Sequence, residues 1–309
     1  MNIVSFLQLV RWKNLLMIAC IQILFKYVYF PIFSVDVTLT NFDFSLLTIA
    51  TLVIASAGYI INDIFDLKAD KINKPDKVII DNLISSKLAY KYYHGLNAVG
   101  IIAGLFVAYR INNISFIAIF IITALLLKLY NSNFKKLPLI GNIIVSLLVS
   151  LSILIVGIFD IIPAITENNK VVQYYAFNVL TDYAIFAFML MLLREIVKDI
   201  EDVNGDKILN MYTLPIVVGK KRSNIIIFAL SFIPLILVTN YSFKNFSNTP
   251  LVLAYMLIVV LLPLLYFMTK ILYAKTKNNY SYASNLLKII MLLGMFSIVI
   301  VSISIHYAE

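Results

Sequence analysis

The chain has 309 residues, of which 61% are hydrophobic and only 13% are charged. Water-soluble domains carry about 25% charged and about 45–50% apolar residues, so this composition excludes an ordinary soluble fold. It also excludes a disordered chain, since disorder requires low hydrophobicity. The single cysteine, Cys20, can form neither an internal disulfide nor a cysteine-based metal cluster. The formal net charge of +9 must therefore be explained within a membrane protein.

Nine apolar segments are long enough to cross a bilayer, because a transmembrane helix needs about 20 residues. In chain order they lie at residues 14–33, 44–65, 90–109, 114–130, 139–162, 175–197, 224–243, 251–272 and 285–306. The sequence lacks the alternating segments of about ten residues that build a transmembrane β-barrel. We therefore predict an all-α fold, a polytopic integral membrane protein with nine transmembrane helices around a central cavity. Residues 1–309 are treated as a single transmembrane domain.

The basic residues predict how these segments are oriented, because Lys and Arg are concentrated in cytoplasmic loops. If the N-terminus is cytosolic, 21 of the 25 basic residues fall on the cytosolic side. The four exceptions are Lys26, Arg110, Lys170 and Lys244. We therefore expect an inner-membrane protein with a cytosolic N-terminus, and this orientation accounts for the net charge. Membrane lipids are expected to surround it, while neither nucleic acid nor an obligatory protein partner is indicated.

Acidic residues are gathered in two short stretches, and orientation does not explain them, since Asp and Glu contribute little to topology. Ten of the 16 carboxylates lie there: Asp63, Asp66, Asp70, Asp76, Asp81, Glu195, Asp199, Glu201, Asp202 and Asp206. Each stretch holds an Asp triplet at i, i+3 and i+7, which places three side chains on one helix face. The triplets are separated by four predicted spans. We therefore predict two pseudo-equivalent four-helix halves plus one helix, with motif-bearing cytosolic loops at about 62–89 and 194–223.

Three carboxylates on one helix end repel one another, and two facing triplets would do so more strongly without a cation between them. Mg²⁺ binds oxygen ligands, and commonly uses one or two carboxylates together with substrate phosphates. The triplets therefore predict a diphosphate held through Mg²⁺, with Asn62 and Asn73 offering further amide oxygens. One triplet alone would be better explained as a solvated helix end, because short motifs often arise by chance. Two triplets in matching register favour the metal site.

The two acidic stretches resemble the two signatures of the UbiA superfamily of intramembrane prenyltransferases. The first match covers residues 62–77, and the second covers residues 199–206 with the Thr-Leu-Pro and Gly that follow by residue 219. A third segment, residues 130–142, is similar to the loop after the family's fourth helix. Many members carry Arg-Pro after the first signature, whereas this chain has Lys77-Val78. Lys is a point charge and lacks the bidentate fork of Arg.

Within the superfamily, residues 136–142 and 194–206 look most like the (S)-3-O-geranylgeranylglyceryl phosphate geranylgeranyltransferase branch. This resemblance implies Mg²⁺-dependent transfer of a prenyl group, with geranylgeranyl favoured, from an allylic prenyl diphosphate to a lipophilic acceptor. The favoured acceptor is geranylgeranylglyceryl phosphate, which would place the reaction in ether lipid biosynthesis. Diphosphate is released, and the active site is expected to open to the cytosolic side.

The resemblance also implies roles for individual residues. The expected metal ligands are Asn62, Asp63, Asp66, Asp70, Asp199, Asp202 and Asp206. The residues expected to bind the diphosphate are Lys77, Tyr130, Lys135, Arg194 and Lys198. The acceptor is expected to contact Arg11, Asn14 and Asn142. Asp66, Asp202 and Lys135 are expected to be catalytic, because charge develops on the departing diphosphate beside them.

Three other functions are compatible with parts of the sequence. The acceptor could instead be aromatic, as in quinone or heme biosynthesis with 4-hydroxybenzoate or dihydroxynaphthoate. A transporter is the main alternative outside the enzymes, but transporters favour broken helices and sites near the bilayer midplane. Here the carboxylates gather at one membrane face. A lipid-binding scaffold would not need six aspartates in matching register.

Overall fold

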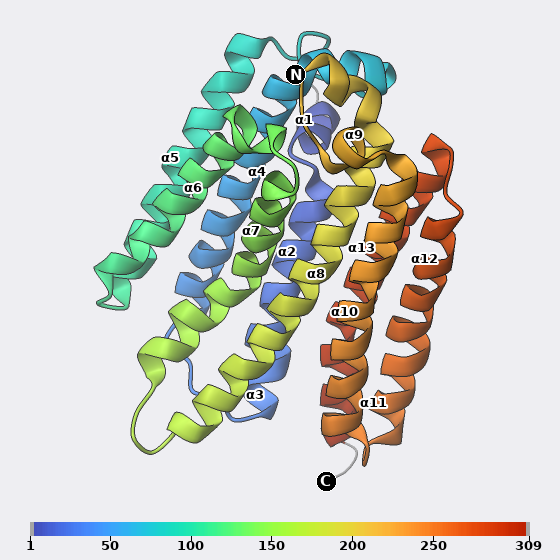
Figure 1. Cartoon of the computed structure of the whole chain (residues 1–309). Coiled ribbons are helices and arrows are strands. Elements are labelled where there is room, and N and C mark those ends of the chain that lie inside the picture. Colours follow the sequence, from blue (N-terminus) through green and yellow to red (C-terminus); the bar gives the residue numbers. More distant parts are fainter. Residues whose placement is uncertain (1–2, 307–309) are drawn as a thin grey trace.

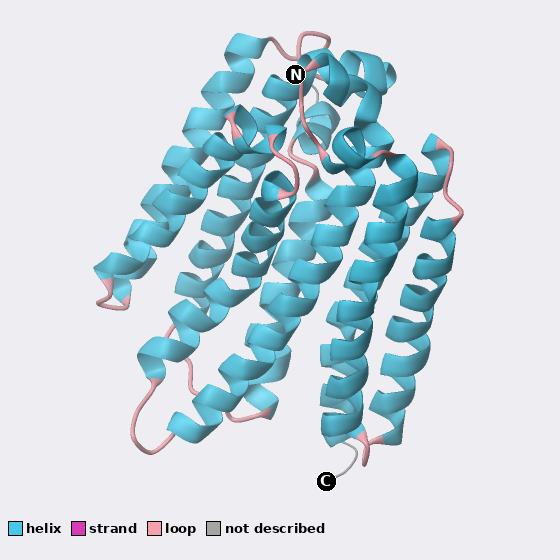
Figure 2. Ribbon diagram, in the orientation of Figure 1, coloured by secondary structure: helices cyan, strands magenta, loops and turns pink. Residues whose placement is uncertain are grey.

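The computed structural model describes residues 3–306, and this part of the chain is helical with short connections (Figures 1 and 2). The α-helices are α1 (Ile3–Leu9), α2 (Trp12–Leu24), α3 (Phe30–Ile32), α4 (Asn41–Asn73), α5 (Ser86–Arg110), α6 (Ile117–Ser132), α7 (Ile140–Val156), α8 (Lys170–Ile208), α9 (Leu214–Val218), α10 (Lys220–Phe246), α11 (Pro250–Tyr255), α12 (Leu262–Leu272) and α13 (Lys277–His306). Short π-helical turns, η1 (Phe25–Tyr29), η5 (Gly157–Ile161) and η7 (Met256–Leu261), continue three of them. The all-α prediction is confirmed for the described residues.

Eight helical segments within residues 3–306 are long and apolar enough to cross a membrane. They are Trp12–Ile32, Asn41–Asn73, Ile114–Ser132, Ile140–Ala164, Lys170–Ile208, Lys220–Phe246, Pro250–Leu272 and Lys277–Ile305. The remaining predicted span, residues 90–109, falls inside α5, which packs along α4 but is less apolar. A membrane protein of long helices is therefore established, while the total of nine spans stays a prediction.

The two Asp triplets belong to long helices rather than to the loops predicted at about 62–89 and 194–223, whereas Asp76 and Asp81 do lie in the connection after α4. Residues 62–73 form the last turns of α4, and residues 194–208 form the last turns of α8. With 33 and 39 residues, α4 and α8 span about 50 Å and about 58 Å at 1.5 Å per residue. Both exceed the hydrocarbon layer of about 30 Å. The loop prediction was wrong because it equated helix ends with the limits of the apolar run, although no proline interrupts α4 before Pro75.

Several chain segments converge on the acidic ends of α4 and α8, a region we call the acidic end of the bundle. Arg11, just before α2, donates to Asp63 near the end of α4, and Lys277, the first residue of α13, donates to the carbonyl of Asn73. Figure 1 shows α9 and the N-terminus at this end, and α3, α11 and the C-terminus at the opposite end. The C-terminal ends of α4 and α8 thus lie together, as predicted from the matched triplets.

Helix α8 belongs to both large apolar cores of the bundle. Its first half packs with η1, α4, α6 and α7 around Phe25, Phe120 and Phe159. Its second half packs with α10, α12 and α13 around Phe267 and Tyr280. Because one continuous helix serves both cores, the position of its acidic end is fixed by packing along its whole length.

A buried ion pair holds the end of the bundle opposite to the acidic end. Lys26 in η1 donates to Asp160 in η5 at 2.7 Å, and their side chains are 4% and 0% exposed. Lys26 also donates to the carbonyl of Leu39, and the Leu39 amide donates to Asp160. The two π-helical turns and the segment before α4 are thereby tied together, and both buried charges have hydrogen-bond partners.

We expect Lys26→Ala to destabilise the protein strongly, because it leaves the Asp160 carboxylate buried without its counter-charge. Breaking a buried pair on one side costs about 3–5 kcal/mol. Thermal unfolding in detergent should show a clear loss of melting temperature. Lys170→Ala removes the exposed pair with Glu167 and serves as the control, with little change expected. Equal melting temperatures for the two variants would contradict the structural role of Lys26.

Candidate active site

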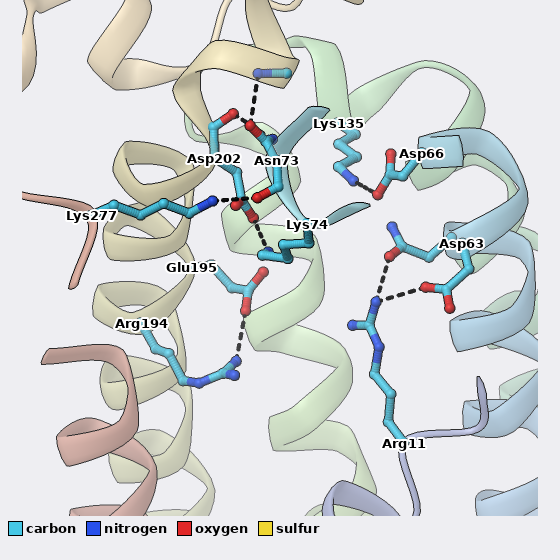
Figure 3. A network of polar contacts seen from close by, with 12 residues as sticks. Arg11, Asp63, Asp66, Asn73, Lys74, Lys135, Arg194, Glu195, Asp202 and Lys277 are labelled. Atoms are coloured by element: carbon cyan, nitrogen blue, oxygen red, sulfur yellow. Dashed lines mark hydrogen bonds and ion pairs between the residues drawn. The ribbon is translucent and has the colours of Figure 1, made fainter. Parts of the chain in front are cut away.

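One large cavity, of about 220 Å³, opens between α2, α4, α6, α7 and α8. Its polar part lies at the acidic end, where side chains from the ends of α4 and α8 lie together with Arg11, Lys74 and Lys135 (Figure 3). Its other part is apolar and continues along the helices as far as Thr51, Phe120 and Ile155. The cavity therefore joins a charged chamber to an apolar channel.

Five of the six triplet aspartates line this cavity: Asp66, Asp70, Asp199, Asp202 and Asp206. Asp63, the remaining member, instead accepts a hydrogen bond from Arg11 at 2.9 Å. Asn62 lines the cavity, accepts from Arg11 at 3.0 Å and donates to Asn131 of α6 at 2.9 Å. The spacing argument therefore identified two acidic faces that meet in one chamber.

Basic side chains offset the repulsion between these carboxylates. Lys135, in the turn after α6, forms an ion pair with Asp66. Lys74, directly after α4, forms one with Asp202 of α8 at 2.6 Å. Figure 3 shows both pairs beside the same open space. A charge-assisted hydrogen bond of this kind can be exchanged for one to a phosphate oxygen.

The pKa of Lys135 lies above its ordinary value. Burial by itself would lower this pKa, but the negative charge of Asp66, together with Tyr130, outweighs the burial. The pKa of Arg11 is raised for similar reasons, since the carboxylate of Asp63 outweighs burial there. Both side chains therefore remain cations at any physiological pH.

Arg11 occupies an uncommon backbone conformation that fits its position in the site. Its φ of 52° lies in the left-handed region, which non-glycine residues rarely adopt. The residue forms the corner between α1 and α2, and its guanidinium lies 4.9 Å from the ring centre of Tyr59. The corner thus directs the side chain of Arg11 over α4 instead of along α2.

Asn73 joins the acidic ends of α4 and α8 directly. Its amide nitrogen donates to the carbonyl of Asp202 at 2.8 Å, and its amide oxygen accepts from the backbone nitrogen of Gly205 at 3.0 Å. A Cβ atom on Gly205 would come within 2.3 Å of the Asn73 amide nitrogen and 2.9 Å of the Ala69 carbonyl. Glycine is therefore needed at position 205 for the two helices to approach each other.

The structure brings most of the other predicted residues to the cavity. Asn14, Tyr130, Arg194 and Lys198 all line it. Arg194 donates to Glu195 at 3.0 Å, and its Nε is buried without a partner among the described residues.

Of the two remaining predicted residues, one lies outside the cavity lining and the other has a side chain that the structure does not describe. Asn142 donates to Asp199 at 2.8 Å and is not part of the cavity lining. The side chain of Lys77 lies outside the described part of the chain.

Several residues of the site were not singled out from the sequence for a role. Lys74 was counted only as an orienting charge, although it stands inside the first signature-like stretch. Glu195 and Asn131 line the cavity, and Tyr59 lines it beside Arg11. Lys74 stands at i+11 from Asp63, and this spacing could have placed it on the acidic face beside Asn73, whose amide oxygen the sequence analysis already includes. Nothing in the sequence predicts that Asn131 meets Asn62, since 69 residues separate them.

The chamber offers the ligands that Mg²⁺ prefers. Within residues 3–306, no group of three or more His, Cys, Asp or Glu lies close enough together to hold a metal ion. Mg²⁺ does not require such a group, since it is usually bound through one or two carboxylates, substrate phosphates and water. The carboxylates here offer oxygen atoms as metal ligands. Oδ1 of Asp202 is buried and has no hydrogen-bond partner among the described residues. The residues therefore fit Mg²⁺ bound together with a phosphate-bearing ligand.

Comparisons with known proteins agree with this geometry. The model of the UbiA prenyltransferase family matches residues 29–300. Digeranylgeranylglyceryl phosphate synthase of Methanosarcina mazei is 29% identical over 96% of this chain and 97% of its own length. A solved structure described as digeranylgeranylglyceryl phosphate synthase in membranes has a TM-score of 0.63, at 26% identity over 97% of this chain and 98% of its own. A UbiA homologue from Archaeoglobus fulgidus, solved with DMAPP and Mg²⁺, has a TM-score of 0.53, at 16% identity over 96% and 99%.

We expect Gly205→Ala to push the acidic ends of α4 and α8 apart and to lower the melting temperature. The added Cβ meets Asn73 and a backbone carbonyl, and neither can move freely. Gly95→Ala is the matched control, because a Cβ there has no atom within 4 Å. In a helix interior, Ala is favoured over Gly by roughly 0.5–1 kcal/mol, so this control should be neutral or stabilising. If Gly205→Ala were also stabilising, the close approach of the two helices would be disproved.

Proposed function

Because the chain belongs to the UbiA prenyltransferase family, and is thus an enzyme that transfers prenyl groups, we propose the following reaction for it. A geranylgeranyl group passes from geranylgeranyl diphosphate to geranylgeranylglyceryl phosphate, and diphosphate is released. The observation that carries this proposal is the chamber shared by the acidic ends of α4 and α8, which continues into an apolar channel. The name of the Methanosarcina relative supports the choice of acceptor.

The metal would be held by the carboxylates that face the chamber. The proposed carboxylate ligands that line it are Asp66, Asp70, Asp199, Asp202 and Asp206, with Asn62 as an amide ligand. Asp63, which pairs with Arg11 outside the cavity lining, stays a predicted ligand. When bound, Mg²⁺ stabilises the negative charge that develops on the diphosphate as its bond to the allylic carbon breaks. A related fold solved with Mg²⁺ supports this assignment.

The basic residues of the chamber would bind the diphosphate oxygens. Lys135 and Lys74 now pair with Asp66 and Asp202, so each can turn from a carboxylate to a phosphate oxygen within the same space. The buried Nε of Arg194 has no hydrogen-bond partner within the part of the chain that the structure describes, and Lys198 lies one turn further along the same helix. These cations act mainly on the departing group, where they lower the transition state more than the ground state. Tyr130 and Lys77 are the other proposed diphosphate contacts.

Measured from Asp66, the cavity has about the length of a geranylgeranyl chain. Along α4 the cavity lining extends from Asp66 to Thr51, and these fifteen residues correspond to about 22 Å at 1.5 Å per residue. An extended carbon chain advances about 1.2 Å per bond, as the polypeptide backbone does, so the sixteen-carbon main chain of a geranylgeranyl group measures about 18 Å. Phe120 lines the part of the cavity far from the aspartates, and we propose its ring, which lies against Gly104 and Phe159, as the floor. Four isoprene units therefore fit above this floor.

The acceptor phosphate would lie near the start of α2. Asn14 lines the cavity and accepts a hydrogen bond from Lys288 of α13 at 2.5 Å, and Arg11 stands one helical turn away. Arg11 and Lys288 would offer two cations, and Asn14 an amide, to an anionic head group. The predicted contact between Asn142 and the acceptor stays a prediction, since that amide is used by Asp199.

The membrane arrangement is also part of the proposal. We infer nine spans, with α5 as the one beyond the eight apolar segments, arranged as two four-helix halves plus α13. The bias of basic residues supports an N-terminus in the cytosol and a chamber that opens to it, in the inner membrane. Prenyl diphosphate, the lipid acceptor and membrane lipids would then be its only required partners.

The direct test is to incubate the purified protein with geranylgeranyl diphosphate, Mg²⁺ and a mixture of geranylgeranylglyceryl phosphate, 4-hydroxybenzoate and dihydroxynaphthoate. Mass spectrometry should show a prenylated glyceryl phosphate with stoichiometric release of diphosphate, and chelation of the metal should stop both. A prenylated aromatic acid as the sole product would overturn the proposed acceptor. Unchanged turnover after chelation would overturn the metal requirement.

We expect Asp66→Ala and Asp202→Ala each to lower the turnover number by about 100- to 1000-fold, the usual loss when a group that stabilises transition-state charge is removed. Glu201→Ala, on the same helix as Asp202 but outside the cavity lining, is the matched control and should keep nearly full activity. Circular dichroism should show that all three variants remain folded. Full activity in both aspartate variants would contradict the proposed site.

We expect Phe120→Ala to extend the channel and to change the preferred donor. The ratio of kcat/KM for a C25 diphosphate over the C20 diphosphate should rise about tenfold or more, since a lost pocket wall removes the penalty on extra methylene groups. Ile122→Ala, on the same helix but 54% exposed at the outer face, should leave this ratio unchanged. If Phe120→Ala folds and keeps the original ratio, the floor of the channel lies elsewhere.

A further inference from the structure

A second cavity, of about 170 Å³, lies at the end of the bundle opposite to the acidic end. Its walls come from η1, α8, α10, the start of α11 and the end of α13. In Figure 1 these segments meet at the end marked by α3, α11 and the C-terminus. The packed core around Phe25 and Leu180 separates this cavity from the channel described above. It is therefore a distinct space.

The lining of this cavity is aromatic and uncharged. Four tyrosines contribute to it, namely Tyr29, Tyr175, Tyr183 and Tyr241. Among residues 3–306, no charged side chain lines it. Aliphatic side chains, including Ile298 and Val301, form the rest of the wall. Such a surface suits a ligand that combines an apolar body with a neutral polar group.

Tyr29 indicates where the polar group of such a ligand would lie. The residue is 3% exposed, and its ring lies 4.5 Å from that of Phe33. Its hydroxyl is buried and has no hydrogen-bond partner among the described residues. Leaving a buried hydroxyl unpaired costs about 1–3 kcal/mol, and native proteins rarely accept that cost. Tyr183, by contrast, already bonds to Ser297 at 2.5 Å, so among the four tyrosines Tyr29 has the hydroxyl that is both buried and without a partner in the described part of the chain.

The position in the membrane indicates the class of ligand. Tyr29 and Tyr241 lie near the ends of membrane-crossing segments, where tyrosines mark the level of lipid head groups and ester linkages. A prenyl diphosphate or a lipid phosphate would bring charge into a cavity without cations, and burying an unpaired charge is very unfavourable. We propose that this cavity binds the glycerol region of one neutral glycerolipid, with an oxygen of its glycerol or ester groups hydrogen-bonded to the hydroxyl of Tyr29. This inference does not depend on the proposed reaction.

Native mass spectrometry of the full chain tests this inference, with dioleoylglycerol as the probe and squalene as a hydrocarbon of similar size without oxygen. The wild-type protein should retain one dioleoylglycerol and bind squalene at least tenfold more weakly. Tyr29→Phe removes only the hydroxyl and should weaken dioleoylglycerol binding about tenfold, the equivalent of one hydrogen bond. Val301→Trp fills the cavity and should abolish binding. Ser304→Trp, at the edge of the same cavity, gives a second filling variant if Val301→Trp does not fold.

Equal binding of squalene and dioleoylglycerol, or unchanged dioleoylglycerol binding in Tyr29→Phe, would overturn the assignment of a lipid oxygen to Tyr29. Retention by a folded filling variant at the wild-type level would place the lipid outside this cavity and overturn the site. Mg²⁺-dependent release of diphosphate is measured in the same samples and should be unchanged in every variant. Failure of that reaction in the wild-type protein would count against the proposed function and not against the lipid site.

Discussion

The contact between the acidic ends of α4 and α8 is the constraint on which the rest of the structure depends. Two carboxylates 4 Å apart repel by about 4 kcal/mol at an effective dielectric constant near 20, so such ends separate unless something holds them. Here Asn73 bonds to the backbone of α8, Gly205 removes the steric obstacle, and Lys74 adds a cation to Asp202. The packing of α8 against both apolar cores also holds its acidic end in position. These contacts hold several carboxylates close together in one chamber, which is the arrangement that a multivalent cation can bind.

The length of α4 and α8 explains how one cavity can serve two kinds of chemistry. Because both helices continue past the hydrocarbon layer, the same faces carry aspartates near their ends and apolar residues further along. An ionic head group and a hydrocarbon tail are then accommodated by neighbouring turns of the same helices. A shorter helix followed by a loop would hold the carboxylates less rigidly, and their separation would no longer be set by the bundle.

Sequence periodicity predicted the parts of the site that lie on one helix face, and little of what joins different helices. The i, i+3, i+7 spacing identified Asp66 and Asp202, and the family-like segment after α6 identified Lys135. The bond between Asn73 and Gly205 was not predictable, because it links positions 132 residues apart through a close backbone approach. The predicted loop boundaries were wrong because hydropathy indicates where the apolar segment ends, whereas the helix continues beyond that point. The tyrosine-lined cavity is formed by residues of five elements, η1, α8, α10, α11 and α13, and no local sequence pattern predicts that they meet.

The cavity follows the long axis of α4, from an ionic opening at the acidic end to an aromatic floor at Phe120. An amphiphile dissolved in one leaflet already has its head at the interface and its tail parallel to the bilayer normal. Such a molecule would meet this enzyme in the orientation that it needs, and neither tumbling nor extraction into water would be required. Its search is then confined to a plane, so surface density, rather than bulk concentration, would govern how often the enzyme is loaded.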